Sequence, residues 1–503
     1  MSTAQNTWTD PSGRQVALQV RPLIEGRSVD SASSEQWTKY SPRDGQPLMQ
    51  FAVGSAEDVD RAIRSGRGAF EDGRWSDLPV ARRSEILLKW ADSIEREAKS
   101  LAALETLEVG KPIRDAQNID LALGSGVLRF NAVNADKASG TVVPAEPRSL
   151  CQTTRSPRGV VGAIVGWNFP LVLAIMKAGP ALAMGNSLVL KPSELSSLSA
   201  LRLAELALEA GVPEGVFNVV PGIGKTVGDA LARHPDLDML SFTGSTATGR
   251  QLMVSAGQST MKPLLLECGG KSPNIVFDDC PDLDAVADAV TARMYWNQGQ
   301  VCTAGSRLLV QDSIKEQLLE RIHSRARALV PGDPFDPATT CGPLISAPQM
   351  NKVLGYIQSG LEQGGKLLVG GKATRKETGG YFIETTIFDE VKPQMRIGQE
   401  EIFGPVLAVM TFRDAEEACR LANSTTYGLS ATVWTRSISR IHLMMKKLRA
   451  GEIDIKATAR PSAGPTFASM PLEPHKQSGI GVEGGIEGLQ SYTILRAIKI
   501  YTD

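Results

Sequence analysis

From residue 159 onward, short apolar runs alternate with segments that have helical periodicity. One such segment, residues 198–210, is followed by Gly211 and then Pro213, residue types that commonly mark the end of a helix. The alternation is typical of strands joined by crossover helices, so it predicts an α/β fold around a largely parallel sheet. The predicted strands are residues 160–165, 187–190, 216–220 and 239–242.

The region upstream of this alternation is predicted to be mainly helical. Residues Ser55 to Asp58 have the pattern of a capping box that opens a helix. Residues 82–109 carry apolar side chains at helical spacing throughout and predict one long amphipathic helix.

Length and charge restrict the kind of protein this is. A chain of 503 residues exceeds what one hydrophobic core normally serves, so we expect two or three domains. A formal net charge of -1 gives no electrostatic basis for binding nucleic acid or an anionic membrane. The expected ligand is therefore a small molecule.

The sequence also bears on location. Residues 1–11 lack the pattern of a secretory signal, and polar residues such as Lys177 and Asn186 interrupt the long apolar stretch 159–190, which argues against a membrane span. The six cysteines include no C-x-x-C pair, which favours a reducing compartment. We predict a cytoplasmic protein.

Cys302 is the candidate nucleophile. A lone cysteine is more often a small buried hydrophobe, and a thiol needs an activating environment to react at neutral pH. Cys302, however, follows the amide-rich, glycine-containing segment 297–301, which suits backbone N–H groups directed at a developing oxyanion. Glu267, in the glycine-rich segment 266–271, offers a carboxylate base. The pair predicts covalent catalysis through a thioester.

Other catalytic arrangements find little support in the sequence. The chain has only four histidines, scattered and without an H-E-x-x-H pattern. We therefore predict no metal site and expect the catalytic base to be a carboxylate.

Ligands of such sheets bind beyond the carboxyl ends of the strands, so the residues after each predicted strand are candidate site residues. Val165 is followed by Gly166, Trp167 and Asn168. Asn168 is either a turn-forming residue before an aromatic-proline unit or a donor to an oxyanion.

The next predicted strand is followed by Lys191, Ser193 and Glu194. A carboxylate at this place accepts hydrogen bonds from a ribose diol and repels a 2'-phosphate, which favours NAD over NADP. The alternative is that Ser193 and Glu194 only complement the dipole at the start of a helix.

Two further strand ends carry residues that suit a dinucleotide. The segment from Gly224 to Gly228 only loosely resembles a dinucleotide-binding glycine pattern. The segment 242–249 places small residues and hydroxyl groups at the expected start of a helix, where a pyrophosphate binds well.

Taken together, these segments resemble the NAD(P)-dependent aldehyde dehydrogenase superfamily over nearly the full chain. The chain looks nearest to bacterial members that oxidise aminoaldehydes or γ-glutamylaminobutyraldehyde. The matching segments, in chain order, are residues 166–171, 191–194, 242–249, 266–273, 297–303, 400–406 and 476–479.

The resemblance implies a role for each catalytic residue. Cys302 attacks the aldehyde carbonyl, and the Asn168 side-chain amide with the Cys302 backbone N–H holds the oxyanion. After hydride transfer to the nicotinamide, Glu267 activates the water that hydrolyses the thioester, which releases a carboxylic acid.

The resemblance also implies the cofactor contacts, with NAD preferred and NADP possible. Lys191 and Glu194 are assigned to the adenosine ribose, Ser245 to the pyrophosphate, and Glu401 with Phe403 to the nicotinamide end. The full expected cofactor site is Val165, Gly166, Trp167, Lys191, Ser193, Glu194, Gly224, Gly228, Phe242, Thr243, Gly244, Ser245, Thr248, Cys268, Glu401 and Phe403.

The implied architecture has three parts. Residues 1–140 and 158–266 form a Rossmann-like NAD-binding domain, residues 267–478 an α/β catalytic domain, and residues 141–157 with 479–503 a small β arm that builds a homodimer or homotetramer. The carboxyl-terminal segment 492–500 alternates partly in strand fashion, and residues 151–155 are its expected partner.

The chain departs from the family pattern between residues 451 and 476, a segment that usually borders the substrate tunnel. Lys456 and Arg460 there raise the possibility of a negatively charged semialdehyde as substrate, although a solvated charged loop is the simpler interpretation. Three alternatives to an NAD-dependent, hydrolytic enzyme stay open: a CoA-acylating aldehyde dehydrogenase, a cysteine esterase, and a catalytically silent structural homologue.

Overall fold

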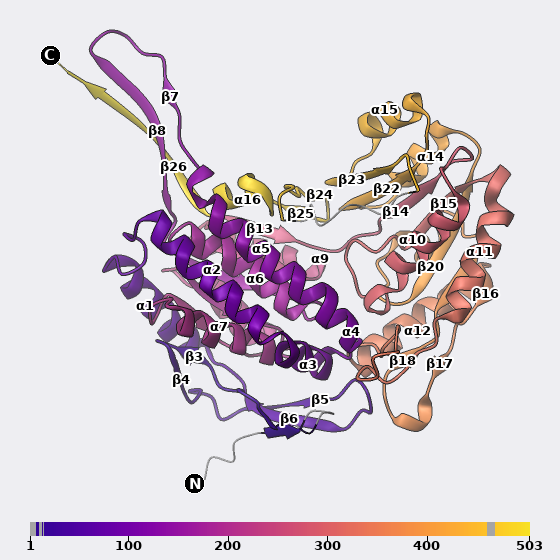
Figure 1. Ribbon diagram of the computed structural model, residues 1–503, viewed down its shortest axis with the longest axis horizontal. Coiled ribbons are helices and arrows are strands. Elements are labelled where there is room, and N and C mark those ends of the chain that lie inside the picture. Colours follow the sequence, from indigo (N-terminus) through magenta and orange to yellow (C-terminus); the bar gives the residue numbers. More distant parts are fainter. Residues whose placement is uncertain (1–6, 10–12, 14, 460–467, 503) are drawn as a thin grey trace.

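Two β-sheets, each packed with helices, and a projecting β arm make up the protein. We describe a computed structural model, in which residues 7–9, 13, 15–459 and 468–502 are described. Figure 1 shows the amino-terminal part of the chain on one side, the residues from about 270 to 456 on the other, and the arm extending away from both. The predicted α/β class is confirmed by the solved structures reported below.

The first sheet contains the strands predicted from the alternating apolar runs. Its five central strands are mutually parallel, whereas β25 and β3 pair antiparallel with their neighbours at the two ends. The eight strands, in spatial order, are β25 (Gly479–Ile480), β13 (Leu264–Glu267), β12 (Met239–Thr243), β9 (Val160–Ile164), β10 (Ser187–Lys191), β11 (Phe217–Val219), β3 (Leu23–Ile24) and β4 (Arg27–Ser28).

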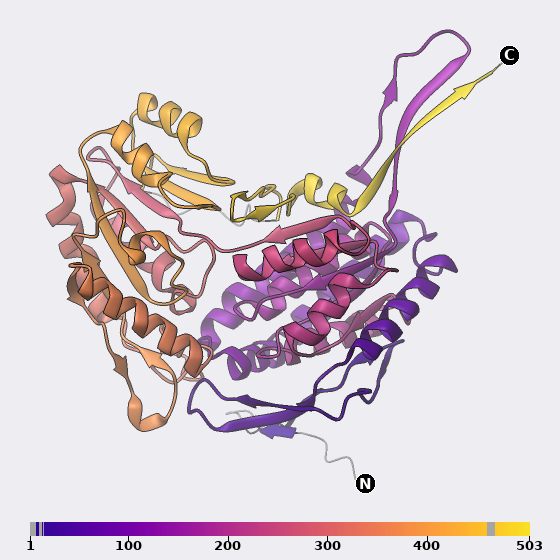
Figure 2. The same cartoon turned by 180° about the vertical axis from the view of Figure 1, so that it is seen from behind.

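The helices of this domain cover both faces of the first sheet (Figure 2). They include α1 (Ala56–Glu71), α2 (Val80–Arg96), α3 (Ala98–Val109), α4 (Ile113–Asp115), α5 (Leu121–Asn134), α6 (Pro170–Ala183), α7 (Leu198–Ala210), α8 (Asp229–Arg233) and α9 (Thr246–Gly257), with η1 (Ala116–Asp120) and η3 (Gly224–Gly228) as π-helical turns.

Two local predictions are met, and one is wrong. The Ser55–Asp58 capping box is present, and α7 ends where Gly211 takes a left-handed conformation with φ of 108°. The single helix expected over residues 82–109 is instead two helices that meet at Glu97, where ψ is 14°. No Gly or Pro marks this break, and α3 beyond it is buried on almost every side, so packing redirects the chain.

The second sheet has seven strands, all parallel except β16 at one edge. In spatial order they are β16 (Lys366–Val369), β19 (Thr386–Asp389), β20 (Val406–Phe412), β15 (Arg307–Gln311), β14 (Pro273–Val276), β22 (Ser430–Trp434) and β23 (Glu452–Lys456). Its helices are α10 (Leu283–Tyr295), α11 (Lys315–Ala328), α12 (Ala347–Glu362), α13 (Arg396–Gln399), α14 (Ala415–Ala422) and α15 (Ile438–Lys447), with the short turn η4 (Trp296–Gly299).

The arm is a three-stranded antiparallel sheet. The predicted pairing is present: β26 (Thr493–Tyr501) runs against β8 (Ser149–Pro157), with Leu495 opposite Arg155, and β7 (Val142–Val143) lies on the other side of β8. Helix α16 (Gly485–Ser491) leads into β26. The short strand β25 belongs to the first sheet rather than to the arm, although the domain limits themselves stay a prediction.

Small two-stranded ribbons complete the secondary structure: β1 (Thr7–Thr9) with β2 (Gln15–Ala17), β5 (Gln36–Tyr40) with β6 (Pro47–Ala52), β17 (Ala373–Thr374) with β18 (Phe382–Ile383), and β21 (Tyr427–Gly428) with β24 (His475–Lys476). None of the helices in the described ranges is both long and apolar enough to cross a bilayer.

Candidate active site

All of the predicted cofactor residues except Glu401 and Phe403 lie along one edge of the first sheet. Strands β13, β12, β9, β10 and β11 are adjacent and parallel, so their carboxyl ends share that edge. Because of this order, residues that are far apart in the sequence form a row that runs from Glu267 at one end to the loop after β11 at the other.

Asn168 lies in the middle of this row, between β9 and α6. Its side chain is buried, and Nδ2 donates a hydrogen bond of 2.9 Å to the carbonyl of Gln300. The Asn168 carbonyl in turn accepts from Nδ2 of Asn297 at 2.9 Å. Val165 is buried, and a Cβ at Gly166 would lie 3.4 Å from Asn168 Oδ1. The amide is thus fixed to the loop that carries Cys302.

Lys191 and Glu194 face each other at the end of β10. Lys191 is 3% exposed, and its ammonium lies 3.2 Å from a Glu194 carboxylate oxygen. Burial lowers the pKa of Lys191, although Glu194 opposes the shift. Ser193 is buried and accepts from the backbone N–H of Leu195, which shapes the turn between the two charges.

The loop after β12 opens helix α9. Ser245 is the N-cap and accepts from the backbone N–H of Thr248 at 3.2 Å. Both hydroxyl side chains are exposed, so the positive end of the helix dipole is open to an anion. Before this turn, Gly244 packs against Phe242, where a Cβ would lie 2.5 Å from the ring, and the Thr243 hydroxyl is buried without a hydrogen-bond partner.

The glycines after β11 have more space around them than Gly244 has. A Cβ at Gly224 would meet nothing within 4 Å, and one at Gly228 would touch only Ile164 at 3.7 Å. These glycines form the π-helical turn η3, which leaves open space in front of the sheet edge.

A five-residue bridge, residues 268–272, joins β13 of the first sheet to β14 of the second. A Cβ on Gly270 would lie 2.2 Å from the Cys302 carbonyl oxygen, and a Cβ on Gly269 would lie 2.4 Å from a Glu401 carboxylate oxygen. The Gly270 N–H donates to Glu401 at 3.0 Å. Only glycine allows this approach, so the bridge brings Glu267, Cys302 and Glu401 together.

The loop before Cys302 has an unusual backbone. Asn297, Gln298 and Gly299 all have positive φ, at 48°, 57° and 71°. Two non-glycine residues in this conformation cost roughly 1–3 kcal/mol each, and such strain clusters at functional sites. Hydrogen bonds from the Asn297 and Gln300 side chains to nearby carbonyls hold the turn.

The Cys302 thiol is half-buried. Burial, reinforced by the negative charges of Glu401 and Glu267, raises the pKa of Cys302 to about 12. Hydrogen bonding from the backbone N–H groups of Thr303 and Cys302 partly opposes this shift. The thiol is therefore protonated at neutral pH until a base or a positive charge is brought beside it.

Glu267 is buried, and one of its carboxylate oxygens has no hydrogen-bond partner. Burial, strengthened by the charge of Glu483, raises its pKa well above the ordinary range. Lys177 partly opposes this shift and forms a buried ion pair with Glu483.

Sequence reasoning missed the functional proximity of Lys177 and Glu483. The available signal was a lysine in an otherwise apolar helix, which we read only as an argument against a membrane span. Nothing in the sequence around Glu483 pairs it with a residue 306 positions earlier.

Three further predicted residues lie in the same region. The Phe403 and Trp167 rings meet edge to face with centroids 5.2 Å apart, so residues from the two domains share one wall. Cys268 is buried, and burial, with Glu267 and Glu401 nearby, raises its pKa to about 12. Cys268 packs in the apolar cluster beneath Phe242.

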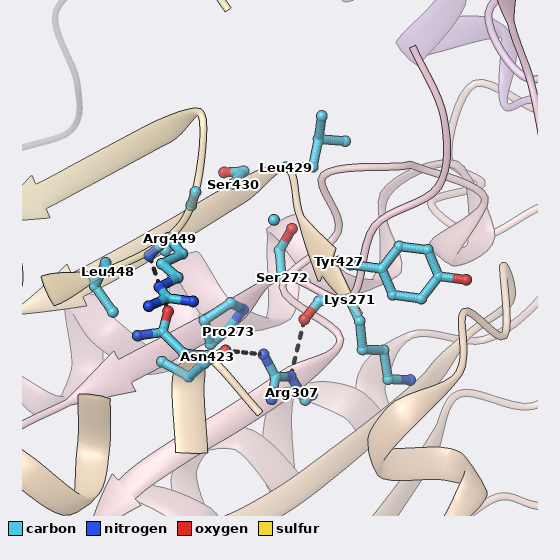
Figure 3. A pocket seen from close by; sticks show the side chains of 14 residues that line it. Lys271, Ser272, Pro273, Arg307, Asn423, Tyr427, Leu429, Ser430, Leu448 and Arg449 are labelled. Carbon is cyan, nitrogen blue, oxygen red and sulfur yellow. Dashed lines mark hydrogen bonds between the residues drawn. The ribbon is translucent and has the colours of Figure 1, made fainter. Parts of the chain in front are cut away.

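A small cavity of about 10 Å³ lies on the other side of the bridge, with room for about one water molecule. Figure 3 shows Arg307 beside it, donating to the carbonyl of Lys271 at 2.9 Å. Arg307 also donates to the carbonyls of Leu421 and Ala422. This buried guanidinium anchors the end of the bridge.

The described residues fit a dinucleotide but show no metal site. One sheet edge carries three features that suit a dinucleotide. They are the exposed N-terminus of α9, the open glycine turn after β11 and the Thr243 hydroxyl, which has no hydrogen-bond partner. No group of three or more His, Cys, Asp or Glu side chains suited to a metal ion occurs within the described ranges.

Lys456 pairs with Asp454 at 2.9 Å, whereas Arg460 lies outside the described residues.

The fold and the site together define a class of two-domain dehydrogenase that has a cysteine between a dinucleotide-binding edge and a second sheet. Residues 29–498 match the aldehyde dehydrogenase family. The chain belongs to that family, which confirms the predicted reaction class, NAD(P)-dependent oxidation of an aldehyde.

Particular relatives agree with this assignment. The chain is 44% identical over 493 residues to the NADP/NAD-dependent aldehyde dehydrogenase PuuC of Escherichia coli, covering 98% of each chain. It is similar to the solved structure of γ-glutamyl-γ-aminobutyraldehyde dehydrogenase from Burkholderia cenocepacia, with a TM-score of 0.93, 44% identity and 97% of each chain covered. The structure of the P. syringae indole-3-acetaldehyde dehydrogenase AldA, in complex with NAD+ and IAA, matches with a TM-score of 0.94, 47% identity and 97% of each chain.

Proposed function

We propose that this enzyme oxidises its aldehyde through a covalent Cys302 thioester that water hydrolyses. The observation that carries the proposal is the bridge between the sheets, where Gly270, three residues after Glu267, lies against the Cys302 carbonyl. A nucleophile that precedes β15 of the second sheet and a buried carboxyl at the end of β13 of the first sheet are thereby held at one place.

The first step forms a bond between Cys302 Sγ and the carbonyl carbon. The π electrons move to the carbonyl oxygen, and the thiol proton passes to a base. Asn168 Nδ2 and the Cys302 backbone N–H are the donors for this oxyanion, and each such donor typically contributes two to three orders of magnitude in rate, or about 2.7–4 kcal/mol. Asn168 has a second amide hydrogen besides the one that it gives to Gln300.

NAD, when bound beside Glu401 and Phe403, would supply the acceptor for the hydride of the thiohemiacetal carbon. The carbonyl re-forms as a thioester at Cys302, which is electrophilic enough for attack by water. The Glu267 carboxylate takes a proton from that water, the C–S bond breaks, and the carboxylic acid leaves. Glu267 must be ionised for this step, so its raised pKa favours activity at alkaline pH.

For the cofactor, the candidate residues divide into two groups on the edge of the first sheet and a third beside the second sheet. Lys191 and Glu194 suit the adenosine ribose, Ser245 at the start of α9 suits the pyrophosphate, and Glu401 with Phe403 suits the nicotinamide end. The partly exposed Glu194 carboxylate, 3.2 Å from the buried Lys191 amine, supports a preference for NAD, because a carboxylate in this position repels a 2'-phosphate.

The substrate and assembly are also proposed. The similarity to PuuC and to γ-glutamyl-γ-aminobutyraldehyde dehydrogenase supports an aldehyde of the aminoaldehyde class. Exposed apolar side chains on the arm, such as Val142 at 72% and Leu495 at 55%, support its use as a homodimer or homotetramer contact. A cytoplasmic location stays a prediction from the cysteine pattern.

The test is NADH formation with a panel of aliphatic, aromatic, amino and carboxylated aldehydes, each with and without CoA. Expected results are a free carboxylic acid product, no requirement for CoA and a loss of about 10²- to 10³-fold in Asn168→Ala. An acyl-CoA product would favour the CoA-acylating alternative. Ester hydrolysis that is independent of NAD, with no NADH from any aldehyde, would favour an esterase.

A further inference from the structure

A buried charged cluster lies behind the proposed oxyanion site. Lys111, Glu105 and Asp120 have fully buried side chains. The Lys111 ammonium donates to Glu105 at 2.5 Å and also to Asp120. Burying three ionisable groups is costly, and replacing such a cluster with apolar residues is often neutral or stabilising. Stability alone therefore does not account for it.

The two acids of the cluster keep Lys111 charged. Burial, together with the neighbouring Glu105, raises the pKa of Asp120 well above the ordinary range, although Lys111 opposes the shift. For Lys111, burial disfavours the charged form, but the two acids outweigh it and raise the pKa. The Lys111 side chain is therefore an ammonium at neutral pH in spite of its burial.

The Lys111 ammonium also lies 4.0 Å from the centroid of the Phe169 ring. A desolvated cation over an aromatic face is strongly attracted to it. On another side, the Phe169 ring meets Trp296, with centroids 4.9 Å apart. Phe169 is thus held between an ammonium from the first domain and an aromatic ring from the loop of the nucleophile.

Both residues of this aromatic pair are adjacent in the sequence to residues of the oxyanion site. Phe169 follows Asn168, and Trp296 precedes Asn297. Asn297 Nδ2 donates to the Asn168 carbonyl, and Asn168 Nδ2 donates to the Gln300 carbonyl, each at 2.9 Å. A shift of the Phe169 ring therefore moves the Asn168 amide relative to Cys302.

The segment that carries Lys111 is itself fixed. Gly110 has a φ of 75°, and a Cβ there would lie 2.5 Å from Pro343 of the second domain. The Ile113 N–H donates to the Pro334 carbonyl at 2.8 Å. The segment that carries the ammonium is thus held against residues of both domains. A group that positions another residue at their junction requires such support.

We infer that Lys111 is a positioning residue for the oxyanion donor, acting on Asn168 through the face of Phe169, with Glu105 and Asp120 holding its ammonium in place. The inference rests on the proposed role of Asn168. It assigns a catalytic purpose to a charge cluster that touches neither substrate nor cofactor.

The test is a double-mutant cycle that combines Lys111→Gln with Asn168→Ala. The measured quantity is the rate of NADH formation in a single turnover. Lys111→Gln alone is expected to lower the rate about tenfold, with the Kd for NAD unchanged, because the cation–π contact is lost but the cofactor residues are not touched. In the Asn168→Ala background the same substitution is expected to cost less than about twofold.

A matched control separates positioning from the general loss of a buried ammonium. Lys262 is also buried and donates to the Ala232 carbonyl at 2.7 Å, away from the sheet edge. Lys262→Gln is expected to leave the rate within about twofold of wild type. If Lys111→Gln does not fold, Phe169→Leu takes its place, with the same expected loss and the same dependence on Asn168.

The outcomes separate the inference from the function on which it rests. Full activity in Asn168→Ala would overturn the proposed oxyanion role itself. Severe impairment in Asn168→Ala, with a Lys111→Gln effect of equal size in both backgrounds, would overturn only the inference. A Lys111→Gln variant with the wild-type rate would do the same.

Discussion

The two sheets present opposite edges to the site. The cofactor residues other than Glu401 and Phe403 lie at the carboxyl ends of strands in the first sheet. There Ser245 is the N-cap of α9, and a helix N-terminus of this kind binds anions. Cys302, Glu401 and Phe403 instead lie before the amino ends of β15 and β20 in the second sheet. The first edge has an exposed helix N-terminus and open space at Gly224, whereas the second edge is crowded where Gly269 and Gly270 meet Glu401 and Cys302.

The difference explains the state of the thiol. A cysteine at a helix N-terminus has its pKa lowered, but Cys302 lies shortly after the end of α10 and near two carboxyl groups, and its pKa is raised to about 12. The first edge is thus suited to binding without rearrangement, while the second has a nucleophile that stays inactive until its surroundings change.

The largest expected effect separates chemistry from binding. Cys302→Ala should lower kcat by at least about 10⁴-fold, because no other described thiol lies at the bridge in an accessible position. The Kd for NAD, measured by fluorescence titration, should stay within about threefold, because the residues of the first edge are unchanged. Loss of NAD binding in this variant would contradict the assignment of cofactor binding to the first edge and of the chemical step to the second.

The next effect concerns Glu267 and pH. Glu267→Gln should lower steady-state kcat by about 10²- to 10⁴-fold, while the first NADH turnover persists, because only hydrolysis needs this base. In the wild type, kcat should increase with pH as the raised pKa of Glu267 is approached, since only the carboxylate accepts a proton from water. The variant should lose that part of the pH profile in stopped-flow and steady-state rates; an unchanged profile would assign the base elsewhere.

A pair of glycine substitutions compares the two edges directly. Gly270→Ala should lower kcat by about 10²-fold, since its Cβ would lie 2.2 Å from the Cys302 carbonyl and displace the nucleophile. Gly224→Ala, where a Cβ meets nothing within 4 Å, should keep the melting temperature and change kcat by less than about threefold. Equal sensitivity at both glycines would show that the edges do not differ as described.

The smallest effect concerns the choice of cofactor. Glu194→Gln removes the charge 3.2 Å from Lys191 and should shift the kcat/KM ratio of NAD to NADP by about tenfold toward NADP. The kcat with saturating NAD should hardly change, because the adenosine end is remote from the reacting atoms. A lower kcat with an unaltered ratio would mean that Glu194 only supports the turn.

Much of the first edge was predictable, because it rests on local signals. The strand ends predicted from periodicity for β9 to β12 all lie within one residue of the observed ends. Gly211 correctly marked the end of α7. The rule that ligands bind beyond strand carboxyl ends then selected Asn168, Lys191 and Ser245. The same rule does not reach the second edge, where only the family resemblance indicated Glu401 and Phe403.

The sequence by itself determined the elements, the reaction class and the residue types that carry the chemistry, because strand and helix periods and short glycine-rich motifs are read within a few residues. Only the tertiary structure decided that Gly270 meets the Cys302 backbone, that Lys177 pairs with Glu483 beside Glu267, and that Lys111 lies over Phe169. Such contacts join residues that are tens to hundreds of positions apart, and they depend on how two independently patterned domains pack, which no local pattern records.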